Sequence, residues 1–533
     1  MRSPLGPSER WTLIAAILGS GIVFLDSTVV NVALPRIGRD LPSALLGVLE
    51  GQSYVYNGYL LTVSALLILA GALNDFFGRK RLFTMGLAGF LVTSVLCGIA
   101  PNLELLVLSR VLQGIAGAIL VPGSLSLLTV TFRGEAQGRA FGLWAGASGA
   151  TTILGPFVGG ILVDTISWRA VFLINVPLLV IALWATATYV RESRDETASG
   201  RFDWLGASAV ALAVGGLSFG TIYGQQREWR DPLGALLLAI GAAATITLPF
   251  LMTRRRAPLI PPALFRSRNF SVTNISTFLI YGALYVVGYY LTLFLQGVVG
   301  FTAAAAGLAS LPASLFLVFL SSRFGALAAR RGPRMFMAVG PALMALGILW
   351  YARIPATMTP WLFAPDDTRT WSPPVAYFTD LLPGQLLFGF GLSVMVAPLT
   401  TALMTSVPAG HSGVASAINN AISRVGPQLA GALIFVALTA SFYAALQQRV
   451  PAIDPSREDV RRAIAPLNVQ TPAIALPVDT ARLITAEREA STDAFHVAMV
   501  ISAVLLAAGA VVNGFGIEDR PALVEVPLVT PAD

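Results

Sequence analysis

The sequence predicts an all-α integral membrane protein, and its composition is the first reason. Of the 533 residues, 55% are hydrophobic and only 12% are charged, and the mean hydropathy is +0.73. Soluble domains carry about 25% charged residues, so this chain has more apolar surface than a water-exposed fold can bury. The net charge of +7 is divided among short clusters between apolar runs. This pattern indicates membrane topology rather than nucleic-acid binding.

The composition also excludes several kinds of catalysis. Cys97 is the only cysteine, so the chain cannot form an intramolecular disulfide. With His411 and His496 as the only histidines, it offers no zinc or iron–sulfur ligand set. The only lysine, Lys80, does not end the Gly-Lys-Ser/Thr sequence of a phosphate-binding loop. We therefore expect no metal, no resident cofactor and no ATP-driven step.

Apolar runs long enough to cross a bilayer follow one another along the chain. A helix that rises about 1.5 Å per residue needs about 20 such residues to cross roughly 30 Å of hydrocarbon. Fourteen runs meet this requirement. They lie near residues 11–35, 53–73, 82–100, 103–131, 140–163, 168–190, 204–222, 233–252, 270–296, 302–324, 335–353, 377–406, 412–440 and 494–514.

Basic residues favour a cytoplasmic position for both chain ends. An even number of spans places both termini on one side, and arginine is more frequent in the segments that then face the cytoplasm. The first run is too long for a signal peptide, contains Asp26 and lacks a small-residue cleavage site, so we expect it to be retained. The sequence therefore predicts a multi-pass protein of the plasma (cytoplasmic) membrane, the cell inner membrane, with both termini cytoplasmic.

Two segments of the first half recur in the second half. GALNDFFGRK at 71–80 follows span 2, and GALAARRGPR at 325–334 follows span 10. Likewise, GPFVGG at 155–160 lies in span 5 and GPQLAG at 426–431 lies in span 13. Spans 1–6 thus correspond to spans 9–14, with spans 7 and 8 inserted between them. The expected domains are an N-terminal six-helix bundle over 1–200, two inserted helices over 201–268 and a C-terminal six-helix bundle over 269–533.

Four short motifs on the expected spans resemble those of one transporter family. Span 1 contains LDSTVVNVALP at 25–35, the loop after span 2 contains GALNDFFGRK at 71–80, and span 4 contains RVLQG at 110–114. Together with the Gly-Pro pair at 155–156, they resemble the major facilitator superfamily, specifically its 14-helix drug:proton antiporter branch of the multidrug efflux type. The resemblance covers essentially the whole chain. It implies proton-driven export by the rocking of two six-helix bundles.

The resemblance also implies roles for two sets of residues. On the turn after span 2, Asp75 would face the N-terminal dipole of a helix in the opposite bundle and latch the outward-open state. The expected cytoplasmic gate consists of Gly71, Asp75, Gly78 and Arg79. In span 5, glycines allow close helix packing, and a proline kinks the helix. The expected helix-packing antiporter motif consists of Gly155, Pro156, Gly159 and Gly160.

Asp26 is the only acidic residue deep inside a predicted span. At about 1.5 Å per residue, Asp26, Arg110 and Arg424 all lie about 10–12 Å from the outer face. A carboxylate in a membrane costs roughly 2.5–3.5 kcal/mol, and burial favours its protonated form whereas a guanidinium favours its ionised form. We therefore expect Asp26, Arg110 and Arg424 to be proton-coupling residues. The alternatives are a static pair of Asp26 with either arginine, or an Asp26 that caps backbone groups, and both only hold helices together.

Polar and aromatic side chains on several spans are candidates for a substrate cavity. Tyr281, Tyr285 and Tyr289 recur every four residues on span 9, a spacing that suits stacking on an aromatic or cationic guest. The further candidates are Asn57, Tyr59, Gln113 and Asn420. For the tyrosines, the alternative is an interfacial aromatic belt or ordinary packing.

The stretch 441–493 interrupts the apolar pattern. It contains five prolines and alternating charges, so it cannot cross a bilayer. We expect an extracytoplasmic, solvated loop with two short amphipathic helices, which forms a structural cap without a ligand role.

The resulting functional prediction is a proton-coupled secondary active exporter of amphipathic or cationic small molecules such as drugs, which would confer antibiotic resistance. One alternative is a flippase for lipids or lipid-like metabolites on the same fold. Another is a non-transporting membrane receptor or a passive channel. No nucleophile–base pair stands out, so we expect no enzyme. The expected partners are the substrate, protons and the lipid bilayer, with no nucleic acid, and the expected state is a monomer driven by the proton gradient.

Overall fold

The computed structural model is almost entirely helical. It describes residues 6–43, 48–132, 134–193, 203–226, 231–254, 258–407, 412–469 and 478–519. Within these ranges it contains no β-strand beyond two isolated bridges, and thirteen helices are long and apolar enough to cross a membrane. A further helix, α5 (Gly134–Thr165), corresponds to span 5 and contains the apolar stretch Leu154–Val163. The predicted all-α membrane fold is confirmed.

The helices follow the predicted order of spans. The first predicted bundle contains α1 (Pro7–Asp40), α2 (Val48–Phe77), α3 (Arg79–Gly98), α4 (Leu103–Thr131), α5, α6 (Ala170–Leu173) and α7 (Asn175–Tyr189). The inserted pair is α8 (Trp204–Gln226) and α9 (Pro232–Thr253). The second bundle contains α10 (Arg268–Phe294), α11 (Ala303–Ala309), α12 (Leu311–Arg331), α13 (Arg334–Tyr351), α14 (Leu382–Thr405), α15 (Ser412–Arg449), α16 (Glu458–Ala463) and α17 (Thr480–Gly516). Short 3-10 turns cover Pro262–Arg266 and Thr368–Thr370, and π-helical turns cover Leu295–Val299 and Tyr377–Leu381.

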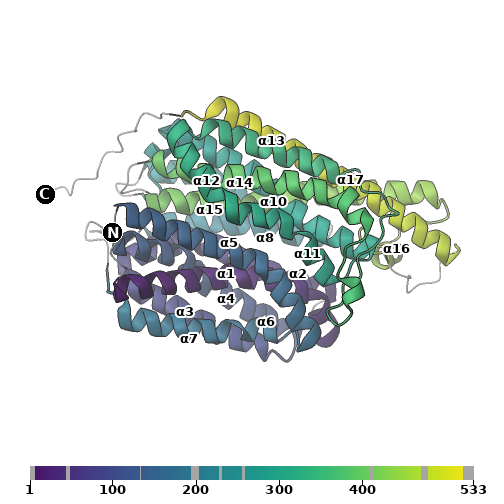
Figure 1. Ribbon diagram of the computed structural model, residues 1–533, viewed down its shortest axis with the longest axis horizontal. Coiled ribbons are helices and arrows are strands. Elements are labelled where there is room, and N and C mark those ends of the chain that lie inside the picture. Colours follow the sequence, from purple (N-terminus) through teal and green to yellow (C-terminus); the bar gives the residue numbers. More distant parts are fainter. Residues whose placement is uncertain are drawn as a thin grey trace. The chain divides into compact units, whose positions relative to one another are not determined.

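The chain divides into two compact units. Unit 1 comprises the described residues up to Ser271 together with Leu403–Val425, and unit 2 comprises Val272–Ala402 and the described residues from Gly426 onward. Helices α1 to α9 therefore all belong to unit 1. Within it, α1, α3, α4, α5 and α7 run alongside one another (Figure 1).

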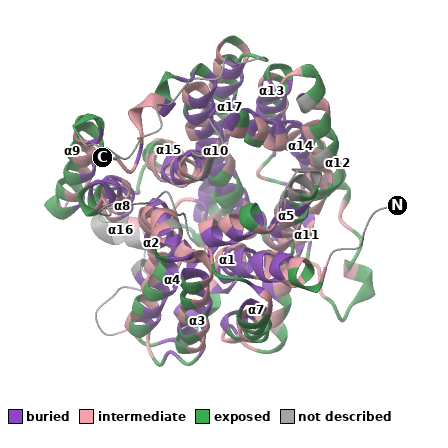
Figure 2. Ribbon diagram, turned by 90° about the vertical axis from the view of Figure 1, so that its left-hand side faces the viewer, coloured by how far each residue is buried: buried purple, intermediate pink, exposed green. Residues whose placement is uncertain are grey.

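The inserted helices α8 and α9 pack mainly on each other. A Cβ added to Gly216 would lie 2.7 Å from the backbone of Gly241, and one added to Gly234 would lie 2.7 Å from the backbone of Gly224. Such close backbone approach requires glycine and is a common way to join helices in a membrane. On α9, the buried described residues are Gly234, Gly241 and Met252, and the rest of this helix is half-buried or exposed (Figure 2).

One apolar cluster joins the inserted helices to other parts of unit 1. It brings together the predicted cytoplasmic ends of several helices, including the ends of α14 and α15 that belong to this unit. Its buried members are Ile68, Val210, Met252, Ile260, Leu264, Phe270, Leu403, Val407, Ala415, Ile418 and Ala421. The inserted pair is thus anchored by both α2 and the 3-10 turn that leads into α10.

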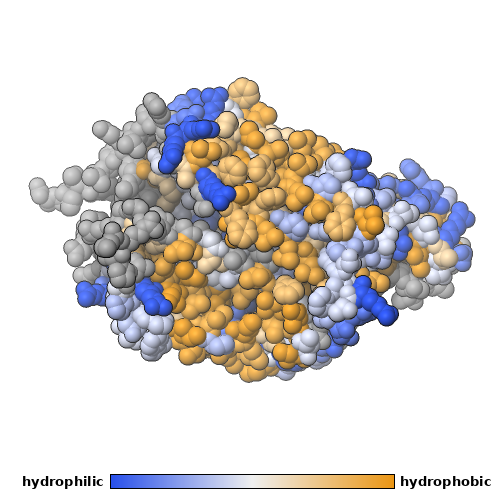
Figure 3. Space-filling view, in the orientation of Figure 1, coloured by the Kyte–Doolittle hydropathy of each residue, from blue (hydrophilic) through white to orange (hydrophobic). Residues whose placement is uncertain are grey.

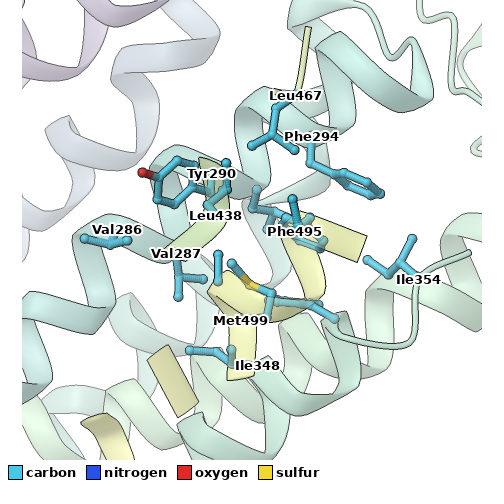
Figure 4. Packing of buried hydrophobic residues seen from close by; sticks show 14 of the residues in the cluster. Val286, Val287, Tyr290, Phe294, Ile348, Ile354, Leu438, Leu467, Phe495 and Met499 are labelled. Carbon is cyan, nitrogen blue, oxygen red and sulfur yellow. The ribbon is translucent and has the colours of Figure 1, made fainter. Parts of the chain in front are cut away.

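Unit 2 is held together by a large apolar core. Phe294 of α10 stacks on Phe495 of α17 with ring centroids 4.1 Å apart and planes at 9°, and Met499 and Ile348 lie close by (Figure 4). Aromatic pairs in this geometry stabilise a core by about 0.5–1.5 kcal/mol beyond the area they bury. Helices α10, α13, α15 and α17 all contribute to this core.

The stretch 441–493 differs from the predicted solvated loop. Helix α15 continues to Arg449 and α17 already begins at Thr480, so both helices extend well beyond the apolar runs. Between them, Val450, Ile453 and Leu467 are buried in the core of unit 2. The segment is also fixed by backbone contacts, since the Val469 N–H donates to the Gly297 carbonyl at 3.0 Å. The prolines and charges predicted exposure because sequence does not show which side chains the flanking helices cover.

The distribution of apolar and hydrophilic side chains on the surface is the one that a lipid bilayer requires. Hydrophobic side chains cover the middle of the helices in the view of Figure 3, and hydrophilic ones gather toward their ends. Many exposed residues are large and apolar, such as Ile246 on α9, which is 77% exposed. In water, an apolar surface this extensive would be unfavourable, whereas hydrocarbon solvates it without cost.

Candidate functional site

Asp26 and Arg110 form an ion pair in the interior of unit 1. Asp26 lies in the middle of α1, and Nη1 of Arg110 on α4 donates to its Oδ2. Both side chains are 0% exposed. The start of α4 is fixed by Asn102, whose side chain accepts from the Leu105 N–H at 2.9 Å, and this cap places Arg110 two turns inside the helix. Of the two partners that the sequence allowed for Asp26, the structure selects Arg110.

The guanidinium of Arg110 is held from several sides. Its Nε donates to the Val55 carbonyl of α2 at 3.1 Å, and Nη1 also donates to Oε1 of Gln113 at 2.6 Å. The rings of Tyr59 and Phe172 lie with their centroids 4.1 Å and 5.7 Å from the central guanidinium carbon. These contacts favour a cation here even apart from Asp26. Among the described residues, Nη2 of Arg110 has no hydrogen-bond partner.

Two residues that the sequence analysis missed complete the environment of Asp26. Nδ2 of Asn175 on α7 donates to Oδ1 of Asp26 at 3.1 Å and to the hydroxyl oxygen of Ser94 on α3 at 3.3 Å. Nε2 of Gln113 donates to the same hydroxyl at 2.8 Å and lies 3.4 Å from Oδ1 of Asp26. We call Asp26, Ser94, Arg110, Gln113 and Asn175 the Asp26 cluster, and all five are buried. The available signal was a lone asparagine within the apolar run 168–190.

The Asp26 cluster connects four helices through one carboxylate. Donors from α4 and α7 converge on Asp26 of α1, and α3 contributes Ser94. A buried carboxylate is costly unless charge and hydrogen bonds compensate it, and here both do. Any change in the charge of Asp26 therefore acts on the packing of all four helices.

Arg424 occupies a different environment. It is half-buried on α15, in the part of this helix that belongs to unit 1, and among the described residues it makes no hydrogen bond or ion pair with Asp26. Its charge acts electrostatically on Tyr59, whose hydroxyl donates to the Val23 carbonyl at 3.1 Å. Its role as a proton-coupling residue stays a prediction.

The predicted cytoplasmic gate lies at the junction of α2 and α3. Gly78 has φ +108°, a conformation that favours glycine, and it is the N-cap residue directly before α3. The segment after α7 caps this helix, because Glu192 accepts from the N–H groups of Lys80 and Arg81, both at 3.0 Å, and the Ser193 carbonyl accepts from the Arg79 N–H at 2.9 Å. A Cβ added to Gly71 would lie 3.6 Å from the Cβ of Pro122 on α4. The Asp75 side chain lies outside the described part of the chain.

The glycines of span 5 lie against α1. A Cβ added to Gly155 would collide with the Thr28 side chain, and one added to Gly159 would lie 3.0 Å from the carbonyl oxygen of Val29. Gly160 has more room, with Val32 at 4.0 Å. Pro156 lies inside α5, where it removes one backbone donor. The close approach occurs one turn beyond Asp26 on α1, so the packing of α5 and the Asp26 cluster share a helix.

The cavity candidates fall into different environments. Tyr59 and Gln113 are wholly buried at the Asp26 cluster, which is not the open wall expected for substrate contact. Asn57 donates to Ser53 at 2.9 Å, and Asn420 donates to the Ser416 carbonyl at 2.9 Å, each within its own helix.

The three tyrosines of span 9 lie on α10. Tyr285 and Tyr289 are 55% and 47% exposed, and Tyr281 is half-buried with its ring centroid 6.3 Å from that of Tyr285. Two exposed tyrosines one helical turn apart present aromatic faces to whatever lies beside α10. Within the described residues, no group of three His, Cys, Asp or Glu side chains is placed to hold a metal ion.

Comparison with known proteins agrees with this architecture. A family model described as Major Facilitator Superfamily matches residues 16–452. The multidrug resistance protein Stp of Mycobacterium tuberculosis is 32% identical over 85% of this chain and 80% of its own length. The tetracenomycin C resistance and export protein of Streptomyces glaucescens is 34% identical over 80% of this chain and 75% of its own length.

A solved structure extends the agreement to the fold. The crystal structure of a bacterial homologue of the human lysosomal transporter Spinster matches 96% of this chain and 98% of its own, with a TM-score of 0.58 and 14% identity. Together with the family match and the two relatives, this establishes a multi-pass membrane protein of a transporter family and not an enzyme. The chain belongs to the major facilitator superfamily.

Proposed function

We propose that this protein is a proton-coupled exporter of amphipathic or cationic small molecules such as drugs. Two relatives that cover most of the chain are named for drug resistance and export, which supports this substrate class. The observation that carries the proposal is the wholly buried ion pair of Asp26 and Arg110. The proton gradient would supply the energy across the cytoplasmic membrane, with both termini cytoplasmic and no resident cofactor.

The energetics of the pair suit a proton switch. When Asp26 is ionised, the pair is neutral and its charges are compensated. A proton on Asp26 removes one charge and leaves Arg110 as a buried cation whose main partner has become neutral. That state favours a rearrangement that gives the guanidinium new partners or water. Protonation and conformation are thereby coupled, as exchange of a proton for a substrate requires.

The surroundings of Arg110 lower the free-energy cost of this rearrangement. The Val55 carbonyl and the ring of Tyr59 still contact the guanidinium after the charge of Asp26 is lost. The cation therefore keeps partial compensation, and the two states differ by less than the full cost of a bare buried charge. On the substrate side, the exposed faces of Tyr285 and Tyr289 suit aromatic cations.

The test is uphill transport by the purified full-length protein in lipid vesicles. Vesicles with an acidic interior are exposed to ethidium, an aromatic cation, and its accumulation is followed by fluorescence. We expect the natural protein to concentrate ethidium and to lose proton-driven accumulation with Asp26→Asn, while folded protein stays in the membrane. Asp40→Asn is the matched control, because Asp40 lies on the same helix and pairs with Arg36 at the surface.

Other outcomes would contradict the proposal. Full accumulation by Asp26→Asn would remove Asp26 from coupling. Ethidium flux that runs only downhill and ignores the pH step would indicate a passive channel. Movement of a labelled lipid without ethidium transport would indicate a flippase.

A further inference from the structure

Asn175 contacts the Asp26 carboxylate although no motif includes it. The predicted span 168–190 is interrupted at Ile174, where α6 ends and α7 begins. Pro177 lacks the N–H that would bond the Leu173 carbonyl in a continuous helix, which explains the interruption. Asn175 is the first residue of α7 and is wholly buried, and its Nδ2 lies 3.1 Å from Oδ1 of Asp26.

The side-chain amides of Gln113 and Asn175 differ in whether they can rotate by about 180°. Oε1 of Gln113 accepts from Nη1 of Arg110 at 2.6 Å and from the thiol of Cys97 at 3.5 Å, so the orientation of this amide is fixed. Oδ1 of Asn175 has no hydrogen-bond partner among the described residues. A rotation of about 180° about the last side-chain bond exchanges the donor and the acceptor of an amide. Asn175 can make this exchange without losing a bond at its oxygen.

This freedom matches the chemistry of a carboxyl group that gains and loses a proton. A carboxylate only accepts hydrogen bonds, whereas a carboxylic acid also donates one. Arg110 carries donors only, so it cannot accept from a protonated Asp26. Asn175 can donate through Nδ2 to the carboxylate and accept through Oδ1 from the acid. The hydroxyl of Ser94, 3.3 Å from Nδ2, is likewise both donor and acceptor.

We propose that Asn175 is a positioning residue for the transported proton. This proposal rests on the proposed role of Asp26. Its amide donates to the Asp26 carboxylate and, once turned over, accepts from the carboxylic acid. Asp26 is thereby held in place by α7 in both protonation states, while its bond to Arg110 breaks and re-forms.

The other charged or titratable groups around Asp26 stay constant in a test of Asn175. Among the described residues these groups are Arg110 on α4, Tyr59 on α2 and Cys97 on α3, and Arg424 on α15 acts electrostatically on Tyr59. The parts of α5, α6 and α7 that contact this region contribute glycine, Phe172 and Asn175, none of which titrates. A change in pH dependence when Asn175 is replaced by leucine therefore reports the loss of its bond to Asp26.

The experiment measures ethidium accumulation by the full-length protein in vesicles as a function of the interior pH. The midpoint is the interior pH at which accumulation is half-maximal. Asn175→Leu should move this midpoint upward by about 0.5–1 pH unit, because the lost bond to the carboxylate is charge-assisted and stronger than the lost bond to the acid. Asn175→Asp keeps the shape but places a second carboxylate at Asp26, and it should move the midpoint further in the same direction.

Asn513→Leu is the matched control. Asn513 is also a wholly buried asparagine, its Nδ2 donates to the Met337 carbonyl of α13 at 2.9 Å, and its Oδ1 has no hydrogen-bond partner among the described residues. It lies on α17 in unit 2, so its substitution should leave the midpoint unchanged.

The outcomes separate this inference from the proposed function. If Asp26→Asn abolishes coupling but Asn175→Leu keeps the natural midpoint, only the role of Asn175 is refuted. If Asp26→Asn retains coupled transport, the proposed function itself fails. Loss of folded protein in both Asn175 variants would also overturn the inference, since it would assign Asn175 to structure alone.

Discussion

Unit 1 and unit 2 contain the two copies of the sequence repeat, yet their interiors are stabilised in different ways. In unit 1, a charged pair and three polar side chains lie where α1, α3, α4 and α7 meet. In unit 2, the corresponding helices meet through an apolar core in which Phe294 stacks on Phe495. The described ion pairs of Arg449 with Glu489 and Asp493 are part exposed at the C-terminal end of α15.

This difference between the two interiors indicates which unit can change its conformation when a proton binds. The ionisable members of the unit 2 core are tyrosines such as Tyr290 and Tyr351, a residue type whose usual pKa of about 10 lies far above neutral pH. The Asp26 cluster instead concentrates four helices on one carboxylate. Buried Glu487 of unit 2 lies near the start of α17, before the apolar run of that helix, and not among crossing spans. We therefore expect unit 1 to carry the proton response and unit 2 to act as the stiffer half.

The largest effect should come from Arg110→Leu. It leaves the Asp26 carboxylate buried without its charged partner, a change that typically costs about 3–5 kcal/mol. The cost should fall as the pH is lowered, because protonation makes Asp26 neutral. Thermal unfolding of the detergent-solubilised protein over a range of pH measures this. Equal destabilisation at every pH would mean that the charge of Asp26 does not change over this range.

A similar loss should follow from Phe495→Ala in unit 2, but with a different pH dependence. Truncation of a buried phenylalanine costs about 3–5 kcal/mol through lost contacts and a cavity. Neither ring of the Phe294–Phe495 stack ionises, and His496, whose ring centroid lies 6.2 Å from that of Phe495, bonds the Ile354 carbonyl instead. The loss should therefore vary much less between neutral and acidic pH than the loss in Arg110→Leu. A loss that varies with pH as in Arg110→Leu would remove the contrast between the two units.

A smaller effect is expected from Gly155→Ala. The added methyl group would collide with Thr28 of α1, and overpacking of this kind costs about 1–3 kcal/mol. Gly160→Ala is the control in the same motif, since its nearest neighbour, Val32, lies 4.0 Å away. Unfolding midpoints of the two variants give the comparison. Equal tolerance of both would show that α1 and α5 can move apart at little cost.

The smallest effect, and the one shared by both units, should come from the helix caps. Glu192 caps α3 after Gly78, and Asp519 accepts from the Arg334 N–H at 3.0 Å to cap α13 after Gly332, which has φ +93°. Glu192→Gln and Asp519→Asn should each cost about 0.3–1 kcal/mol, reduced by salt, because a charge near a helix N-terminus is lost. Thermal shifts at low and high salt measure this. A loss confined to one unit would show that the repeat is not matched at this junction.

Several features were predictable from the sequence because they depend on local pattern. The length of each apolar run determined the spans, and the short motifs predicted the family. The depth of Asp26 and Arg110 within their runs was enough to predict that they lie at one level. These inferences need only the helical rise and the thickness of a bilayer.

Other features could not be predicted from local pattern. Ser94 and Asn175 are ordinary polar residues in apolar runs, and only the crossing of α3 and α7 at α1 makes them partners of Asp26. Gln113 and Tyr59 were assigned to a substrate cavity because sequence does not distinguish a polar side chain that faces a cavity from one that faces a buried charge. The stretch 441–493 was assigned to solvent because its flanking helices extend beyond their apolar runs.

The sequence by itself determined a membrane-spanning helical fold, its internal repeat and a carboxylate placed where ionisation is costly. The tertiary structure alone decided that Arg110 is the ion-pair partner of this carboxylate and that Asn175 of span 6 also donates a hydrogen bond to it. The physical reason is range: hydrophobicity and helix length act along the chain, whereas compensation of a buried charge depends on groups brought together from distant segments.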